Sequence, residues 1–170
     1  MDFLELAKKR YSVRKFTDKK VSDAEIEKII EAGLVAPTAC NKQPFRIIAV
    51  KSEEGLAKFR RCTECHYGCT LGFVICYDEK LCWTSKITDR SSGDIDASIV
   101  ATHMMLEAAD LGIGSTWVMY FIPEAVKEEF ALEDGIIPTA LLVMGYPDKD
   151  AKPSPMHTQY RDRKETVRYE

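Results

Sequence analysis

The sequence lacks the features that mark several large classes of protein. It contains no run of 18 apolar residues, so no segment predicts a transmembrane helix. Its first residues, Met1 to Glu5, have neither the basic nor the apolar region of a secretory signal peptide. It also has no excess of positive charge, because 24 lysines and arginines stand against 27 aspartates and glutamates, a formal net charge of −3. These absences predict a cytoplasmic protein that binds neither membranes nor nucleic acid, whose phosphates need a basic surface.

The composition that is present is typical of an ordinary globular protein. Of the 170 residues, 45% are hydrophobic and 30% are charged. This mixture excludes disordered and collagen-like chains. A chain of this length has room for one core, and we find no internal repeat and no linker long enough to separate domains. We therefore expect a single domain over residues 1–170 that ends in a tail from about residue 147.

Local patterns predict helices and strands along most of the chain. Asp2 can cap a first helix, and Ser22 with Glu25 matches a capping box that opens a second one. Apolar spacing and composition predict helices over 2–9, 22–35, 53–61, 94–111 and 123–130. Short β-branched runs predict strands over 45–51, 72–78, 115–121 and 137–146.

Two of these segments indicate how the chain packs. The helix expected over 94–111 is apolar almost all round, which predicts that protein surrounds it and that His103 is a satisfied core histidine. The tail over 147–170 has too few apolar residues to bury itself. It is either disordered or wraps over another surface, and the surface we expect is a second subunit.

The segment Arg10-Tyr11-Ser12-Val13-Arg14 is the first that could bind a ligand. It places two guanidinium groups and a hydroxyl close together just after a helix. Bidentate, charge-assisted hydrogen bonds from such groups suit a phosphate dianion. A solvated basic loop would have the same composition, and this alternative stays open.

The second segment runs from Ala36 to Phe45 and contains two side-chain amides. Pro44 favours an extended conformation at Gln43, so Asn41 and Gln43 would present their amides on one side of the chain. Amides offer donors and acceptors together, which suits the edge of a heteroaromatic ring. The alternative is a turn that these side chains stabilise.

The third segment, Leu111 to Trp117, follows the long helix. Its two glycines would allow the backbone to approach a planar ligand closely, and Trp117 could flank that ligand. For Gly112 alone, the position just after a helix favours a role as a helix cap.

Together these motifs resemble the nitroreductase family of FMN-dependent oxidoreductases in its short form. The motifs are R-x-S-x-R, A-P-T-x-x-N-x-Q-P-F, S-G-D-I-D-A and L-G-I-G-S-T-W-V, in the order of the family and over nearly the whole chain. The resemblance implies an α+β fold with a mixed central β-sheet flanked by helices. It also implies a domain-swapped homodimer with two FMN sites at the interface. The reaction it implies passes hydride from NAD(P)H through flavin N5 to a small acceptor such as a nitroaromatic or a quinone, with no catalytic side chain.

The resemblance further implies which residues hold the cofactor. The FMN phosphate and ribityl chain would be bound by the first segment, namely Arg10, Tyr11, Ser12 and Arg14, with Arg14 also near the isoalloxazine ring. The partner subunit would contribute Pro37, Thr38 and Asn41, supported by Gln43. The ring would be lined by Gly114, Ser115, Thr116 and Trp117. A basic residue of the tail, Arg161 or Arg163, would complete the phosphate site. The Arg-Lys-Pro-Leu sequence usual in the family is replaced here by Tyr160-Arg161-Asp162-Arg163-Lys164.

Other interpretations stay open. Cys62-Thr63-Glu64-Cys65-His66 matches the C-x-x-C-H pattern of haem attachment, and Cys62, Cys65, His66 and Cys69 could hold zinc or an Fe–S cluster. Reduced thiols in a helix-to-strand connection are the plain alternative, and we expect Cys40 to serve in small apolar packing. A non-catalytic flavin-binding or dimeric module with the same fold is a further alternative.

Overall fold

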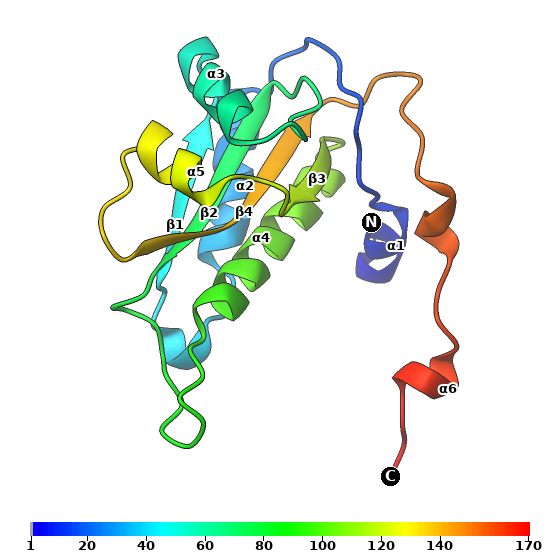
Figure 1. Ribbon diagram of the computed structural model, residues 1–170. Helices are drawn as coiled ribbons and strands as arrows, with labels where there is room; N and C mark the ends of the chain where they lie inside the picture. The colour runs from blue at the N-terminus through cyan, green and yellow to red at the C-terminus, as the bar shows by residue number, and fades with distance from the viewer. Residues whose placement is uncertain (1) are drawn as a thin grey trace.

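A four-stranded sheet forms the middle layer of the structure (Figure 1). This computed structural model describes residues 2–170. The strands are β1 (Phe45–Val50), β2 (Leu71–Asp78), β3 (Gly114–Val118) and β4 (Ile136–Gly145). The helices are α1 (Phe3–Lys9), α2 (Asp23–Leu34), α3 (Glu53–Cys62), α4 (Gly93–Asp110), α5 (Pro123–Glu129) and α6 (Arg163–Thr166), and 3₁₀ turns lie at η1 (Ala39–Asn41) and η2 (Pro155–Thr158). The predicted elements are confirmed, except that β3 ends three residues before the predicted end at Phe121.

The α+β class is confirmed, but the sheet of this chain is not mixed. Its order is β1-β2-β4-β3, and every neighbouring pair is antiparallel. Within residues 2–170, parallel pairing is confined to an isolated bridge between Ser12 and Ser115. The expectation of a mixed sheet is wrong because residues 10–14 meet the edge strand at one point and form no strand there.

Helices cover both faces of the sheet, and a separate apolar core lies under each cover. On one face, α2 and α4 pack on side chains such as Phe73 and Leu142. On the other face, α3 and α5 pack on side chains such as Val74 and Val143. Successive residues of a strand point to opposite faces, so the continuous apolar runs of β2 and β4 fill both cores at once.

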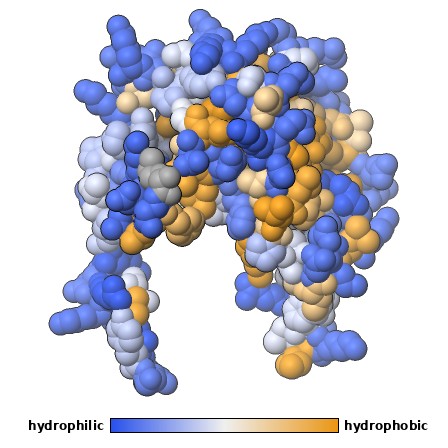
Figure 2. All heavy atoms as spheres, turned by 180° about the vertical axis from the view of Figure 1, so that it is seen from behind, coloured by the Kyte–Doolittle hydropathy of each residue, from blue (hydrophilic) through white to orange (hydrophobic). Residues whose placement is uncertain are grey.

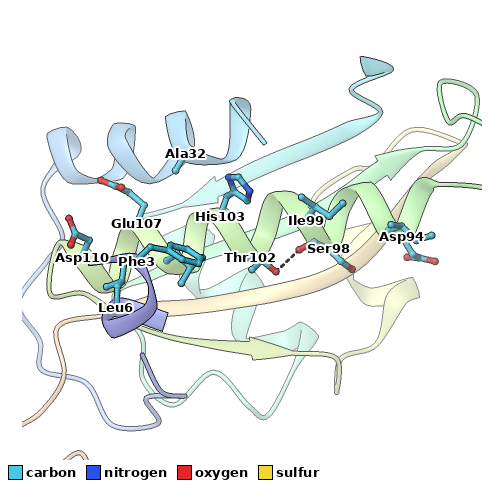
Figure 3. A pocket seen from close by; sticks show the side chains of 12 residues that line it. Phe3, Leu6, Ala32, Asp94, Ser98, Ile99, Thr102, His103, Glu107 and Asp110 are labelled. Atoms are coloured by element: carbon cyan, nitrogen blue, oxygen red, sulfur yellow. Dashed lines mark hydrogen bonds between the residues drawn. The ribbon is translucent and has the colours of Figure 1, made fainter. Parts of the chain in front are cut away.

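One side of α4 is open in this chain. A groove of about 910 Å³ runs along it between α1 and α2 and is lined by apolar residues such as Phe3, Ile95 and Ile99 (Figure 3). Ile95 is 44% exposed, and half-buried His103 lines the groove instead of lying in a core. His103 is therefore not a core histidine in this chain, and this chain alone does not surround α4. An apolar pattern shows that a surface must be covered, but not that the same chain covers it.

Two segments project from the body of the molecule (Figure 2). One is the tail, which leaves β4, passes outside α1 and ends away from the sheet (Figure 1). It meets the body through Tyr11, whose hydroxyl donates to the Ala151 carbonyl (3.3 Å), and through a hydrogen bond between His157 and the Lys8 carbonyl (3.1 Å). The other is the hairpin over 79–92, in which Ile87 is 94% exposed. Within residues 2–170, we find no helix with the length and apolar character needed to cross a bilayer.

The predicted capping box of α2 is confirmed, and it makes folding sensitive to acid. The hydroxyls of Ser22 and Tyr146 donate to the Glu25 carboxylate at 2.5 and 2.7 Å. These bonds, with the Ser22 backbone N–H, lower the pKa of Glu25 from 4.5 to about 2. A lowered carboxylate pKa stabilises the fold above the unfolded value, and this contribution is lost as the pH falls towards 2.

We therefore expect Glu25→Gln to lower the free energy of unfolding at pH 7 by about 1 kcal/mol, a usual value for a helix cap. The difference from the parent should shrink between pH 4.5 and about 2, where the parent carboxylate becomes protonated. Urea denaturation of both proteins at pH 7, 4 and 2.5 measures this difference in the free energy of unfolding. A difference that stayed constant over this pH range would contradict the stabilising role of the Glu25 carboxylate.

Candidate cofactor site

The structure brings the first and third predicted segments together at the edge of the sheet. The Val13 backbone N–H donates to the Ser115 carbonyl (3.0 Å), and the Thr116 hydroxyl donates to the Val13 carbonyl. Residues separated by about a hundred positions thus lie side by side. The basic segment is fixed along β3 and is not a free solvated loop.

Glycine at position 114 is required for this close approach. A Cβ atom there would lie 2.7–2.9 Å from three atoms of the Val13 side chain, well inside contact distance. Gly112 has a different role: its φ is +76°, and it ends α4 with hydrogen bonds from Ile113 to Ala108 (2.7 Å) and from Gly112 to Ala109 (3.1 Å). This is the cap that the sequence favoured for Gly112.

We expect Gly114→Ala to push the 10–14 segment away from β3. The overlap with Val13 costs about 1–3 kcal/mol of folding free energy, as overpacking usually does. The double variant Gly114→Ala/Val13→Ala removes the overlapping atoms and is expected to recover part of the loss. Thermal and urea unfolding give the stability of both variants. If Gly114→Ala were as stable as the parent, the close contact between Gly114 and Val13 would be contradicted.

A cavity of about 180 Å³ opens where these two segments meet. Arg10, Tyr11, Gly114 and Ser115 line it, all of them predicted cofactor residues. Ser115 is 2% exposed, and its hydroxyl oxygen is buried without a hydrogen-bond partner. A buried hydroxyl in this state costs free energy that a polar ligand atom would recover.

The charges around this cavity favour an anion. Within residues 2–170, neither Arg10 nor Arg14 forms an ion pair with a carboxylate. Arg10 lines the cavity with the partnerless Ser115 hydroxyl, and together they are a donor set for a phosphate. The residues present therefore fit the phosphate end of FMN. The cavity is too small for the flavin ring, which needs a further surface.

The second predicted segment lies at the opposite end of α4. The buried Asp96 carboxylate in the first turn of α4 accepts hydrogen bonds from the Ala39 backbone N–H (2.9 Å) and the Ser92 hydroxyl (2.7 Å). Asp96 thereby fixes the loop that contains Pro37, Thr38 and Asn41. Sequence analysis gave Asp96 no role, although it lies within the S-G-D-I-D-A motif.

The conformation of this loop differs from the prediction. Gln43 has a φ of +49° and is not extended, because its backbone N–H turns back to the Thr38 hydroxyl (3.1 Å). Its side-chain amide donates to the Asn41 carbonyl (3.3 Å), so Gln43 stabilises the turn, as the alternative interpretation had it. Cys40, with a φ of +50°, is exposed and does not serve in apolar packing.

The remaining predicted residues are not brought to the cavity in one chain. The 18 residues of α4 rise about 27 Å, and the 37–43 loop and the 10–14 segment lie at its opposite ends (Figure 1). Arg161 and Arg163 lie in the projecting tail, where they contact Glu165 and Tyr169. Trp117 is half-buried against the α4 side of the core.

The cysteine-rich segment shows no cluster of metal ligands among the described residues. Within residues 2–170, no three histidine, cysteine or acidic side chains are placed to hold a metal ion. Burial raises the pKa of Cys62 and of Cys69 to about 11, which keeps both thiols protonated. The His66 ring accepts a hydrogen bond from the Gly68 backbone N–H (3.0 Å) and so closes its own turn. This geometry favours the alternative of reduced thiols.

A comparison with protein families decides the classification. The model of the nitroreductase family matches residues 7–65 and 70–146. The chain belongs to the nitroreductase family. This confirms the resemblance drawn from the four motifs, and the fold agrees with it.

Relatives of this nitroreductase-family chain support the same conclusion. It is similar to a crystal structure of a nitroreductase family protein from Clostridium difficile 630, with a TM-score of 0.94, 40% identity and coverage of 100% of this chain and 99% of that one. A protein of Methanothermobacter thermautotrophicus named "Putative NADH dehydrogenase/NAD(P)H nitroreductase" is 31% identical over 157 residues, 86% of this chain and 78% of the relative. An FMN-dependent nitroreductase from Clostridium difficile R20291 shares the fold, with a TM-score of 0.79, 24% identity and coverage of 98% of each chain.

Proposed function

We propose that this nitroreductase-family chain is an FMN-dependent oxidoreductase that acts as a homodimer. It takes hydride from NAD(P)H and passes it to a small electrophilic acceptor such as a nitroaromatic or a quinone. The observation that carries the proposal is the donor set at the small cavity, where Arg10 and the partnerless Ser115 hydroxyl lie together. Unpaired donors held in this way fit a phosphate-bearing cofactor.

The residues of the chain bind and orient, and the bound flavin supplies the hydride chemistry. Arg10 and Ser12 would hold the phosphate, and Arg14, two residues further along the same segment, would lie near the ring. Gly114 allows this segment to lie against β3. No acid–base pair is needed in the protein, because direct hydride transfer depends on position and on the local charge.

The separation of the predicted segments supports a dimer. One flavin cannot touch both ends of α4 in a single chain, but an antiparallel second copy would place its 37–43 loop beside the first copy's 10–14 segment. The apolar groove along α4 supplies the surface for such pairing. The projecting tail would then lie on the partner and add Arg161 or Arg163 to the phosphate site.

The names of relatives support NAD(P)H as the reductant. Besides the methanogen protein, a relative from Staphylococcus aureus strain USA300 that is 29% identical over 188 residues, 95% of this chain and 75% of the relative, is named an NADPH-dependent oxidoreductase. Nicotinamide nucleotides are therefore the donors to test first.

Visible absorption of the purified protein, before and after anaerobic addition of NADH or NADPH, tests the proposal. We expect flavin bands near roughly 370 and 450 nm that bleach with a nicotinamide nucleotide, as a redox-active bound flavin requires. Flavin bands that neither nucleotide bleaches would indicate a non-catalytic flavin-binding module. A colourless protein that does not bind added FMN would overturn the proposal.

A further inference from the structure

Another cavity opens between the end of α3 and the segment that leaves β3 towards α5. Its volume is about 360 Å³, within the usual range for sites that bind small molecules, about 300–1,000 Å³. Tyr120, which lines it, follows Ser115 of the proposed phosphate cavity by five residues. Five residues of chain span at most roughly 18 Å. One extended ligand, such as a dinucleotide, can therefore reach from the flavin site to this cavity.

Hydrogen bonds hold the two walls of this cavity together. The Thr63 hydroxyl donates to the Tyr120 carbonyl (2.5 Å), and the Ile122 backbone N–H donates to the Cys62 carbonyl (2.9 Å). Cys62 and Thr63 are both buried. Because buried groups fix the walls from one side, little ordering of the chain is needed when a ligand binds.

Arg60 brings a guanidinium group to the edge of the cavity. The helix α3 ends before Thr63, whose backbone is extended, so Glu64 does not take the helical position that would favour pairing with Arg60. Within residues 2–170, neither Arg60 nor Glu64 forms an ion pair. The neighbouring Arg61, by contrast, donates to both carboxylate oxygens of Glu129. Arg60 is therefore the cation of this cavity that is available to an anion.

The rest of the lining suits a flat ring with an amino group. Tyr120 is 73% exposed, so its ring is free to stack on a ligand while its carbonyl stays fixed. Phe121 and Ile122 add apolar surface, and the Glu64 carboxylate can accept a hydrogen bond from an amino group. A purine with an amino group, joined to a phosphate that Arg60 can contact, combines these features in one ligand.

We infer that this cavity binds the adenosine end of the nicotinamide nucleotide and that Arg60 selects NADPH over NADH by contact with the 2′-phosphate. The inference rests on the proposed function, which brings a nicotinamide nucleotide to the flavin. The two nucleotides differ in the 2′-phosphate alone, so an unpaired guanidinium at this end discriminates between them. Contacts at this end are remote from the transferred hydride and serve to hold the nucleotide in place.

Calorimetric titration of the full-length protein with adenosine 2′,5′-bisphosphate and with 5′-AMP tests the site without hydride transfer. We expect the parent to bind the bisphosphate more tightly than 5′-AMP. Arg60→Gln is expected to raise the Kd of the bisphosphate about tenfold, because it removes a charge-assisted hydrogen bond. Glu64→Gln keeps an acceptor but removes a charge that opposes a phosphate, so it is expected to lower this Kd. Damage to the fold would not give these opposite changes.

Anaerobic bleaching of the bound flavin gives the Kd values for NADPH and NADH. Arg60→Gln is expected to reduce the preference for NADPH about tenfold. Tyr120→Ala leaves the backbone bond to Thr63 in place but removes the stacking ring, so it is expected to weaken the binding of both nucleotides about fivefold. Lys28→Gln removes one exposed positive charge from α2, on the opposite face of the sheet, and is the matched control with both Kd values at the parent level.

Each outcome decides a separate point. A parent that binds neither adenosine nucleotide would refute the site, and a bisphosphate Kd unchanged by Arg60→Gln would refute the role of Arg60. Equal weakening by Arg60→Gln and Lys28→Gln would indicate general charge attraction and would also overturn the inference. A parent that binds no FMN would refute the proposed function, whereas binding of the bisphosphate that depends on Arg60 would still support the phosphate site.

Discussion

Mixed dimers of Arg10→Ala chains and Asn41→Asp chains are expected to bind FMN that neither variant binds well alone. Arg10 lies by the C-terminal end of α4, and Asn41 lies by its N-terminal end. In an antiparallel pair, each site takes Arg10 from one chain and Asn41 from the other. One of the two sites in a mixed dimer is then wholly unaltered.

The expected sizes follow from the interactions removed. Losing Arg10 removes charge-assisted bonds to a phosphate, about 1.5–3 kcal/mol, which weakens binding roughly tenfold to a hundredfold. Asn41→Asp keeps a residue that tolerates the φ of +52° but replaces an amide donor by a carboxylate. Random pairing makes about half of the dimers mixed, so about a quarter of all sites bind FMN with the parent affinity.

Refolding the variants together and titrating with FMN measures this recovery. A mixture of Arg10→Ala and Ser12→Ala chains is the matched control. Both substitutions lie in the same half of the site, so no pairing of these chains gives an intact site. Equal behaviour of the two mixtures would show that the site belongs to a single chain. If Arg10→Ala alone bound FMN with the parent affinity, the assignment of Arg10 to the phosphate site would be wrong.

Deletion of residues 150–170 is expected to dissociate the dimer while leaving the body of each chain folded. Within residues 2–170, neither apolar core contains a residue of this tail, and Met156, Tyr160 and Tyr169 are all more than 70% exposed. Their burial on a partner would contribute about 1.5–3 kcal/mol for each large side chain. Losing two of them weakens association by more than about a hundredfold.

Sedimentation of the truncated and full-length chains over a range of concentrations gives the two dissociation constants. Circular dichroism serves as the control and is expected to show that the truncated chain keeps the sheet and helices of the body. Tyr160→Ala in the full-length chain is expected to give an intermediate dissociation constant. A truncated chain that stays dimeric at nanomolar concentration, with its flavin retained, would contradict the role of the tail.

The secondary structure could be predicted because its causes are local. The capping box at Ser22, the cap at Gly112 and the apolar runs of β2 and β4 act within a few residues, and the structure confirms each of them. The expectation of a mixed sheet was wrong for this chain, and the cover over α4 is incomplete in it, because both depend on what lies beside an element. Alternation and periodicity report only that a face is apolar.

The same distinction applies to the cofactor site. The sequence singled out Gly114 for the close approach of a planar ligand, whereas the structure shows that its missing Cβ makes room for the Val13 side chain. The positive φ of Gln43 could not be foreseen, because it follows from a hydrogen bond to Thr38 that competes with the preference imposed by Pro44. The role of Asp96 was missed because it depends on Ala39, a residue far away along the chain.

In the proposed dimer, each flavin would contact the 10–14 segment of one chain and the 37–43 loop of the other, so binding of the cofactor and binding of the partner would be thermodynamically linked. A ligand that contacts both chains of a pair binds the pair more tightly than the separate chains, and the effect is reciprocal. FMN is therefore expected to tighten the association of the chains, and dilution is expected to release FMN. The concentration of the protein itself then sets how much of it carries the flavin.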